Sequence, residues 1–100
     1  MTPQQQAANL LGLARRAGKL TMGEGFVLGA IRDGSAHLVL VATDASANTI
    51  KQFTDKSSFY EVPILKVMTK MAIAEAIGVP RTAIAVVDQG FAKKLIKLLT

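Results

Sequence analysis

The sequence predicts an α/β protein, a three-layer α/β/α sandwich with about four strands and five helices. Two observations support this prediction. Short apolar runs rich in β-branched residues alternate with longer segments whose apolar residues recur at helical spacing. Capping residues and glycines stand at the ends of the helical segments. Because helices alternate with strands, we expect helices on both faces of a sheet and at least some parallel strand pairing.

The first third of the chain should contain two helices joined by a short strand. Thr2 can cap the first helix, which stops at Gly18 because glycine suits the left-handed position after a helix. The segment Lys19–Met22 is long enough only for a short strand. The second helix is expected to begin at Gly23 and to close at Gly34.

The middle of the chain opens with His37–Ala42, whose continuous apolar run is typical of a central strand covered on both faces. Ser46 can cap a third helix, which Ser57 and Ser58 are expected to break. The next strand is Pro63–Val67, in which the proline lies at the first position, where a missing amide matters least.

The last third repeats this alternation once more. Thr69 can cap a fourth helix that ends at Gly78. A loop over residues 79–82 leads into the strand Ala83–Val87, and Asp88 then caps the final helix. The elements are therefore expected in the order α β α β α β α β α.

Length and composition limit the class of protein. The 100 residues suit one domain over residues 1–100, and half of them are apolar, so a buried core is feasible. The absence of cysteine excludes a disulfide framework and a cysteine nucleophile. No apolar run approaches the roughly 20 residues that span a bilayer, and the N-terminus does not resemble a signal peptide. We therefore expect a cytoplasmic protein without a membrane partner.

One face of the second helix is predicted to be buried. Phe26, Val27, Ala30 and Ile31 share one stripe of a helix, so all four are expected to pack in the core. For Phe26 this interpretation is preferred to an exposed ring that stacks on a base.

The same helix is predicted to have a bare entrance. Gly23 and Gly25 leave the first backbone amides unshielded, and free amides at a helix N-terminus favour an anion such as phosphate. Gly25, Gly29 and Arg32 follow one another at steps of four and three residues, so two glycines and a cation share a stripe.

The charge of the chain favours a polyanionic partner. Twelve basic side chains stand against seven acidic ones, which gives a net charge of +5. Lys19, Arg32 and Arg81 are the cations expected to supply positive charge around Gly23–Gly25. If these three side chains do not converge there, the RNA hypothesis loses this physical basis.

Catalytic chemistry finds little support in the sequence. His37 is the only histidine and has no serine or aspartate at a recognised catalytic spacing. Asp44 and Asp88 follow strands, where α/β sheets often bind ligands, but a carboxylate before a helix also serves as a cap. The glycine fingerprint that starts at Gly23 is incomplete because residue 28 is leucine. We therefore expect no enzyme, metal site or cofactor, and an enzyme that uses Asp44 and Asp88 is the weakest hypothesis.

Several of these features occur together in one known family. Gly23, Ala30-Ile31, Gly34, Ala36 and Leu38–Ala42 precede Asp44-Ala45, Val62-Pro63-Ile64 and Ile73–Gly78. This order, from about Lys19 to Val87, resembles the ribosomal-protein family of the archaeal L-seven-Ae and eukaryotic L-thirty-e type. The chain ends, Asn9–Arg16 and Asp88–Leu95, resemble the bacterial YlxQ-type branch of that family. The resemblance implies an α/β/α sandwich that binds RNA, usually at a kink-turn.

The resemblance also implies where RNA is bound: at the N-terminal end of the second helix and the loop before the last strand. Members of the family present Gly-x-Asn-Glu-x-x-Lys at this helix, in which Asn and Glu read guanine edges and Lys grips phosphate. Gly23 matches, and so do Asp44 and the loop Val79-Pro80-Arg81-Thr82. The Asn, Glu and Lys positions are occupied by Gly25, Phe26 and Gly29. The side chains that read the kink-turn are thus missing from this chain.

The leading hypothesis is a non-enzymatic protein that binds structured RNA, such as a kink-turn or ribosomal RNA, without DNA specificity. The candidate RNA-binding residues are Lys19, Gly23, Glu24, Gly25, Gly29, Arg32, Asp44, Val79, Pro80 and Arg81. The alternative is a protein-interaction or small-anion-binding domain that kept the sandwich and lost kink-turn recognition.

Overall fold

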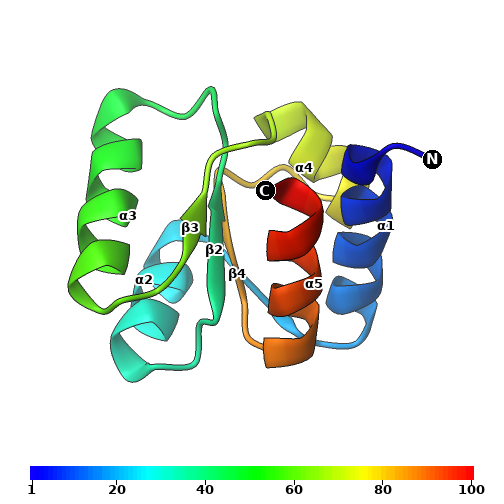
Figure 1. Cartoon of the computed structure of the whole chain (residues 1–100). Coiled ribbons are helices and arrows are strands. Elements are labelled where there is room, and N and C mark those ends of the chain that lie inside the picture. Colours follow the sequence, from blue (N-terminus) through cyan, green and yellow to red (C-terminus); the bar gives the residue numbers. More distant parts are fainter.

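A computed structural model describes the whole chain, residues 1–100, as five helices around a four-stranded sheet (Figure 1). The elements are α1 (Pro3–Arg16), β1 (Leu20–Met22), α2 (Glu24–Asp33), β2 (Leu38–Val41), α3 (Ala47–Phe59), β3 (Ile64–Leu65), α4 (Lys70–Ile77), β4 (Ala83–Val86) and α5 (Gln89–Leu99). The predicted α/β class and the alternating order of elements are confirmed. None of the helices has the length and apolar character needed to cross a membrane.

The strands are arranged in the order β1-β4-β2-β3. β2 and β3 pair in parallel, whereas β4 runs antiparallel to both of its neighbours, β1 and β2. Parallel pairing is therefore present but confined to one pair. β4 is antiparallel because the chain leaves β3, passes through α4 and enters β4 from the same edge of the sheet.

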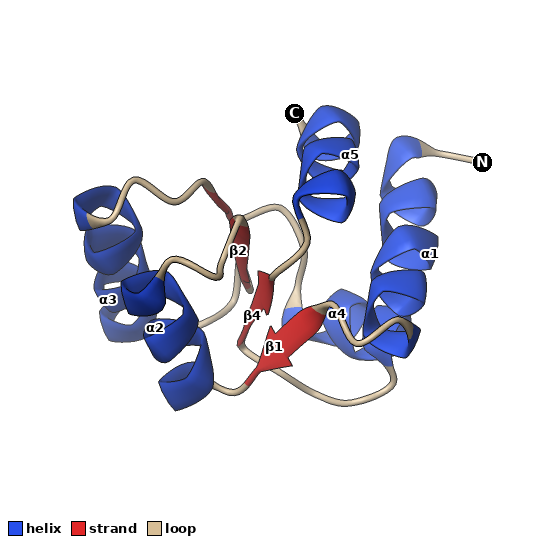
Figure 2. Cartoon of the chain, turned by 90° about the horizontal axis from the view of Figure 1, so that it is seen from below, coloured by secondary structure: helices blue, strands red, loops and turns tan.

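Helices cover both faces of the sheet. Figures 1 and 2 show α2 and α3 on one face and α1, α4 and α5 on the other. All four residues of β2 are buried, and they alternate between the two layers: Leu38 and Leu40 pack with α1, α4 and α5, whereas Val39 and Val41 pack with α2 and α3. This confirms the prediction of a central strand covered on both faces.

Local chain signals define most helix ends as predicted. Thr2, Ser46, Thr69 and Asp88 each accept a hydrogen bond from a backbone amide three residues later. Gly18, Gly34 and Gly78 adopt positive φ angles of 72°, 83° and 85° just after their helices. These interactions satisfy the free backbone groups that every helix leaves at its ends.

The predicted break of the third helix at Ser57 and Ser58 is wrong. α3 continues to Phe59, and Ser57 is completely buried within it. Tyr60 is the C-cap of α3. After it, Glu61 has a φ of 58° and the Val62 amide donates to the Ser57 carbonyl. Helix packing against the sheet has overridden the weak helix propensity of two adjacent serines.

Asp44 joins the end of β2 to the start of α4. Its Oδ1 accepts a hydrogen bond of 2.9 Å from the amide of Lys70, the first residue of α4. The sequence predicts a capping role for this carboxylate, but the capped helix is α4 rather than the helix that follows β2. A carboxylate at a helix N-terminus is also favoured by the helix dipole.

We predict that Asp44→Ala lowers the free energy of unfolding by about 1 kcal/mol, because α4 loses one cap and a favourable charge at its N-terminus. Urea denaturation followed by circular dichroism measures this change. The matched control is Asp55→Ala, which removes only an exposed ion pair with Lys51 on α3 and should cost at most about 0.5 kcal/mol. Equal losses in the two variants would contradict a capping role for Asp44.

Candidate nucleic-acid interface

All four strands reach one edge of the sheet. The strand registers place Met22, Ile84, Leu40 and Leu65 side by side in a single row across β1, β4, β2 and β3. The chain continues past this row with Gly23 on one side and Lys66 on the other. We call this side of the sheet the Gly23 edge. It is the upper end of the sheet in Figure 1, where β2 leads over to α3 and β3 to α4.

The first turn of α2 lies at the Gly23 edge without a side-chain cap. Gly23 occupies the N-cap position with a φ of 98°, which glycine adopts without strain, and no side chain accepts a hydrogen bond there. The Gly23 carbonyl accepts the first backbone hydrogen bond of the helix, 2.9 Å from the Val27 amide. The preceding amides, those of Glu24, Gly25 and Phe26, have no backbone carbonyl within the helix that could accept their hydrogen bonds. The predicted bare helix entrance is confirmed.

Space is open along the glycine face of α2. A Cβ atom added to Gly25 or Gly29 would meet no heavy atom within 4 Å apart from its chain neighbours and the backbone of its own helix. Neither glycine is therefore required by close packing, and both positions would accommodate a side chain. The packing of the fold therefore does not require glycine at these two positions.

The prediction that Phe26 packs in the core is wrong. Val27, Ala30 and Ile31 are buried as expected, but 77% of the Phe26 surface is exposed. Phe26 lies in the first turn of α2, and its ring turns toward the helix entrance: a Cβ on Gly23 would lie 3.5 Å from its Cδ2. An exposed aromatic ring therefore stands beside the uncapped amides.

The loop before β4 also lies at the Gly23 edge. The Ala42 amide donates to the Thr82 carbonyl at 2.8 Å, which fixes the loop beside the end of β2. Pro80 is exposed, whereas Val79 and Arg81 are half-buried. Arg81 donates through one terminal guanidinium nitrogen to the Pro80 carbonyl at 2.8 Å, and its buried Nε has no hydrogen-bond partner.

Two lysines at this edge were missed by sequence reasoning. Lys66 directly follows β3, and Lys70 begins α4, where its amide is held by Asp44. Both residues are exposed. A signal was present, because parallel pairing of the strands before Lys66 and Asp44 would have placed their ends at the same edge.

Lys19 and Arg32 do not converge on Gly23–Gly25, so that expectation is wrong. The Lys19 carbonyl accepts from the Val87 amide at the opposite edge of the sheet, where β1 begins and β4 ends. Arg32 lies in the last turn of α2, about 12 Å along the helix axis from Glu24. Since β1 and α2 each run between the two edges, only Arg81 of the three cations lies near the helix entrance. The expected convergence of charge therefore gives RNA binding no support at this site.

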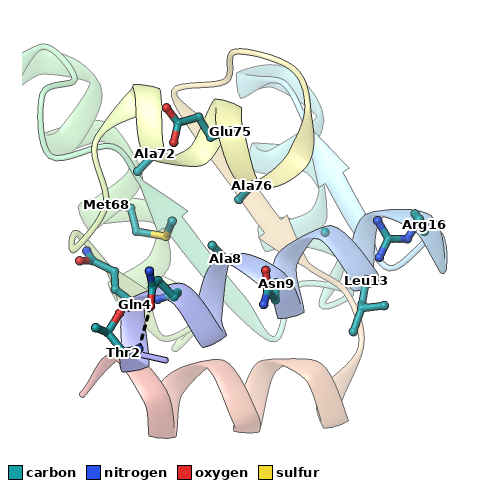
Figure 3. A pocket seen from close by; sticks show the side chains of 12 residues that line it. Thr2, Gln4, Ala8, Asn9, Leu13, Arg16, Met68, Ala72, Glu75 and Ala76 are labelled. Carbon is teal, nitrogen blue, oxygen red and sulfur yellow. Dashed lines mark hydrogen bonds between the residues drawn. The ribbon is translucent and has the colours of Figure 1, made fainter.

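A groove of about 530 Å³ lies between α1 and α4 (Figure 3). It is lined by polar side chains such as Gln4 and Asn9, and Arg16 and Glu75 stand at its rim. None of the ten predicted site residues lines it. No group of three or more histidine, aspartate or glutamate side chains is placed to hold a metal ion. The predicted residues therefore do not line this groove, and those that share the Gly23 edge lie at the surface there.

Known proteins match this chain at the level of a family model, of named relatives and of solved structures. The family model described as "Ribosomal protein L7Ae/L30e/S12e/Gadd45 family" matches residues 5–96. A protein of Enterococcus faecium called RNA-binding protein YlxQ is 49% identical over 96 residues, which is 96% of this chain and 93% of that relative. A protein of Bacillus subtilis (strain 168) with the same name is 50% identical over 91 residues, which is 90% of this chain and 91% of the relative.

Solved structures agree with these matches. A protein of unknown function from Bacillus halodurans C has a TM-score of 0.90 and 38% identity, over 93% of this chain and 95% of that chain. A 15.5 kD RNA binding protein from Giardia lamblia has a TM-score of 0.81 over 97% of this chain and 84% of its own, and at 18% identity it supports the fold. With a family model that spans residues 5–96 and relatives of about half-identical sequence, the chain belongs to the ribosomal protein L7Ae/L30e/S12e/Gadd45 family.

Proposed function

We propose that this protein is a non-enzymatic RNA-binding protein that contacts structured RNA through the Gly23 edge. The observation that carries the proposal is the uncapped first turn of α2, with the exposed ring of Phe26 beside it. The names of the two half-identical relatives, both described as RNA-binding, point in the same direction. Structured RNA of the ribosome or of another cytoplasmic ribonucleoprotein is the partner that we expect.

Phosphate groups are the first part of the RNA that this edge suits. The free amides of Glu24, Gly25 and Phe26 can donate to phosphate oxygens, and the positive end of the α2 dipole favours the same anion. Arg81, Lys66 and Lys70 add positive charge along the edge. Contacts of this kind position RNA without reading its sequence.

Phe26 supplies the second contact. An unpaired base has two apolar faces, and aromatic side chains at protein surfaces stack on such bases in many RNA complexes. A ring with 77% of its surface exposed offers that platform, next to the amides that would hold the neighbouring phosphate. We therefore propose recognition of a bent RNA that carries an unstacked base.

The choice of RNA follows from what the edge lacks. Gly25 and Gly29 present no side chain to a base edge, and the carboxylate of Asp44 is engaged by the Lys70 amide. The kink-turn is therefore recognised, in this proposal, by its shape and backbone more than by its sheared base pairs. Binding of another protein or of a small anion is the competing function. The open glycine face is equally compatible with it, because that face presents no side chain specific to RNA.

We predict that Phe26→Ala weakens binding to a structured RNA with an unpaired loop by roughly 5- to 150-fold, the effect of about 1–3 kcal/mol per stacked base. Fluorescence anisotropy at fixed salt measures the dissociation constant. Phe59→Ala is the matched control, because Phe59 is also 77% exposed but lies at the C-terminal end of α3. Similar losses in both variants, or none in Phe26→Ala, would be evidence against the stacking role.

We predict that Arg81→Ala reduces the dependence of log K on log salt by about one unit, as expected for the loss of one phosphate contact. Titrations at four or five salt concentrations measure the slope. Arg32→Ala is the control: it removes one exposed cation at the far end of α2 and should leave the slope unchanged. RNA binding that is insensitive to salt would refute the proposed phosphate contacts.

We predict that the double variant Gly25→Asn/Gly29→Lys gains selectivity for a kink-turn over a duplex of equal length by about tenfold, since one good base contact contributes about 1–3 kcal/mol. Both side chains have room, so the fold should be retained. A gain would show that the edge kept its geometry for RNA. Unchanged, weak binding of both RNAs would favour the protein-interaction or small-anion function instead.

A further inference from the structure

A second surface lies on the opposite face of the sheet from α2. The antiparallel helices α1 and α5 are neighbours there (Figure 1). A groove of about 530 Å³ lies between them. Leu10, Leu13 and Leu98 form its apolar floor, and Met1 lies at one end. Figure 3 shows Leu13 on the side of α1 that faces α5. We call this surface the α1–α5 groove.

Part of the apolar lining is more exposed than a structural role requires, although Leu10 and Leu98 are half-buried against the core. Leu13 keeps 49% of its surface exposed and Met1 keeps 79%. The core beneath is already closed by Leu11 from α1 and Leu95 from α5, both completely buried. Leu13 and Met1 therefore contribute little to the core and remain available to a ligand.

The rim of the α1–α5 groove is cationic. Lys94 and Lys97 line it, and both are exposed. Neither α1 nor α5 contains an acidic residue, and the single ion pair of the molecule joins Lys51 to Asp55 on α3. The two lysines of the groove therefore have no carboxylate partner within the chain.

We propose that the α1–α5 groove binds an acidic amphipathic helix of a partner protein. Such a helix would lay its apolar stripe on Leu10, Leu13 and Leu98 and bring its carboxylates to Lys94 and Lys97. α5 has 11 residues and is about 16 Å long, which matches three turns of a partner helix.

The chemistry of the groove distinguishes this partner from other anions and from a second copy of the chain. RNA phosphates would satisfy the lysines but would leave the leucine floor in contact with water. Two copies of the groove placed face to face would oppose Lys94 and Lys97 to lysines, because neither helix offers a carboxylate. A flat anionic membrane would not fill the space between two helices.

The test uses the full-length protein labelled with ¹⁵N and two synthetic helical peptides. Both peptides carry leucines at positions i, i+3, i+4 and i+7; one has glutamates on its flanks and the other has lysines. We expect the acidic peptide, at up to about 1 mM, to shift amide resonances of α1 and α5 around Leu13 and Lys94. The basic peptide should not shift them, and structured RNA should shift the Gly23 edge instead.

Three variants separate charge from apolar contact. Lys94→Glu should weaken binding of the acidic peptide by about fivefold or more, whereas Lys93→Glu, a matched charge reversal on α5 outside the groove, should change it by less than about twofold. Leu13→Asn, which keeps the charge, should also weaken binding severalfold.

Several outcomes would overturn the proposal. These are no binding of the acidic peptide, equal binding of both peptides, equal effects of Lys94→Glu and Lys93→Glu, and peptide shifts located at the Gly23 edge. RNA-induced shifts in the α1–α5 groove would assign the surface to nucleic acid. Shifts that depend on protein concentration without peptide would assign it to self-association.

Discussion

The row of paired residues across the sheet, Met22 to Ile84, Leu40 and Leu65, is the constraint on which the candidate interface depends. Each strand is only two to four residues long, so a shift of one residue in any pairing would move a large part of the edge. The alternation of β2 between two apolar layers fixes this register, because a shift by one residue would exchange the faces to which Leu38–Val41 point. The packing of the core thereby determines which loops meet at the Gly23 edge.

The helices α2 and α4 both begin at this edge, but only the first amides of α4 have side-chain acceptors. In α4 the Ala72 amide donates to the hydroxyl oxygen of Thr69, and the Lys70 amide donates to the carboxylate of Asp44. The first amides of α2, which follow the N-cap Gly23, have no such side-chain acceptor. Both ends carry a carboxylate, Asp44 at α4 and the exposed Glu24 in the first turn of α2, but only the one at α4 is shown to accept a hydrogen bond from an amide of its helix, so the amides of α2 remain free to donate to a phosphate. The same edge thus has one satisfied helix terminus and one that is available to an anion.

Local patterns in the sequence were sufficient for the order of elements, the four polar caps and the two-sided burial of β2, because each depends on residues close together in the chain. Local patterns were not sufficient to predict contacts that depend on the assembled fold. The exposure of Phe26 depends on its place in the first turn of α2, and the partner of Asp44 depends on the position of α4. Lys19 and Arg32 were grouped with Gly23 by closeness in sequence, although β1 and α2 carry them to the opposite edge. Open space at Gly25 and Gly29 became visible only with the neighbours in place.

The net charge of +5 does not describe a single binding surface. Lys94 and Lys97 lie on the face opposite α2, and Lys19 lies at the far edge of the sheet, so Arg81, Lys66 and Lys70 are the cations spread along the Gly23 edge. A regular duplex, whose affinity comes mainly from many phosphate contacts, would gain little from three cations. Free amides and an exposed ring contribute most when a phosphate approaches along the helix axis and a base is unstacked, which occurs where RNA bends sharply. The distribution of charge therefore favours a bent, partly unpaired RNA over a continuous helix.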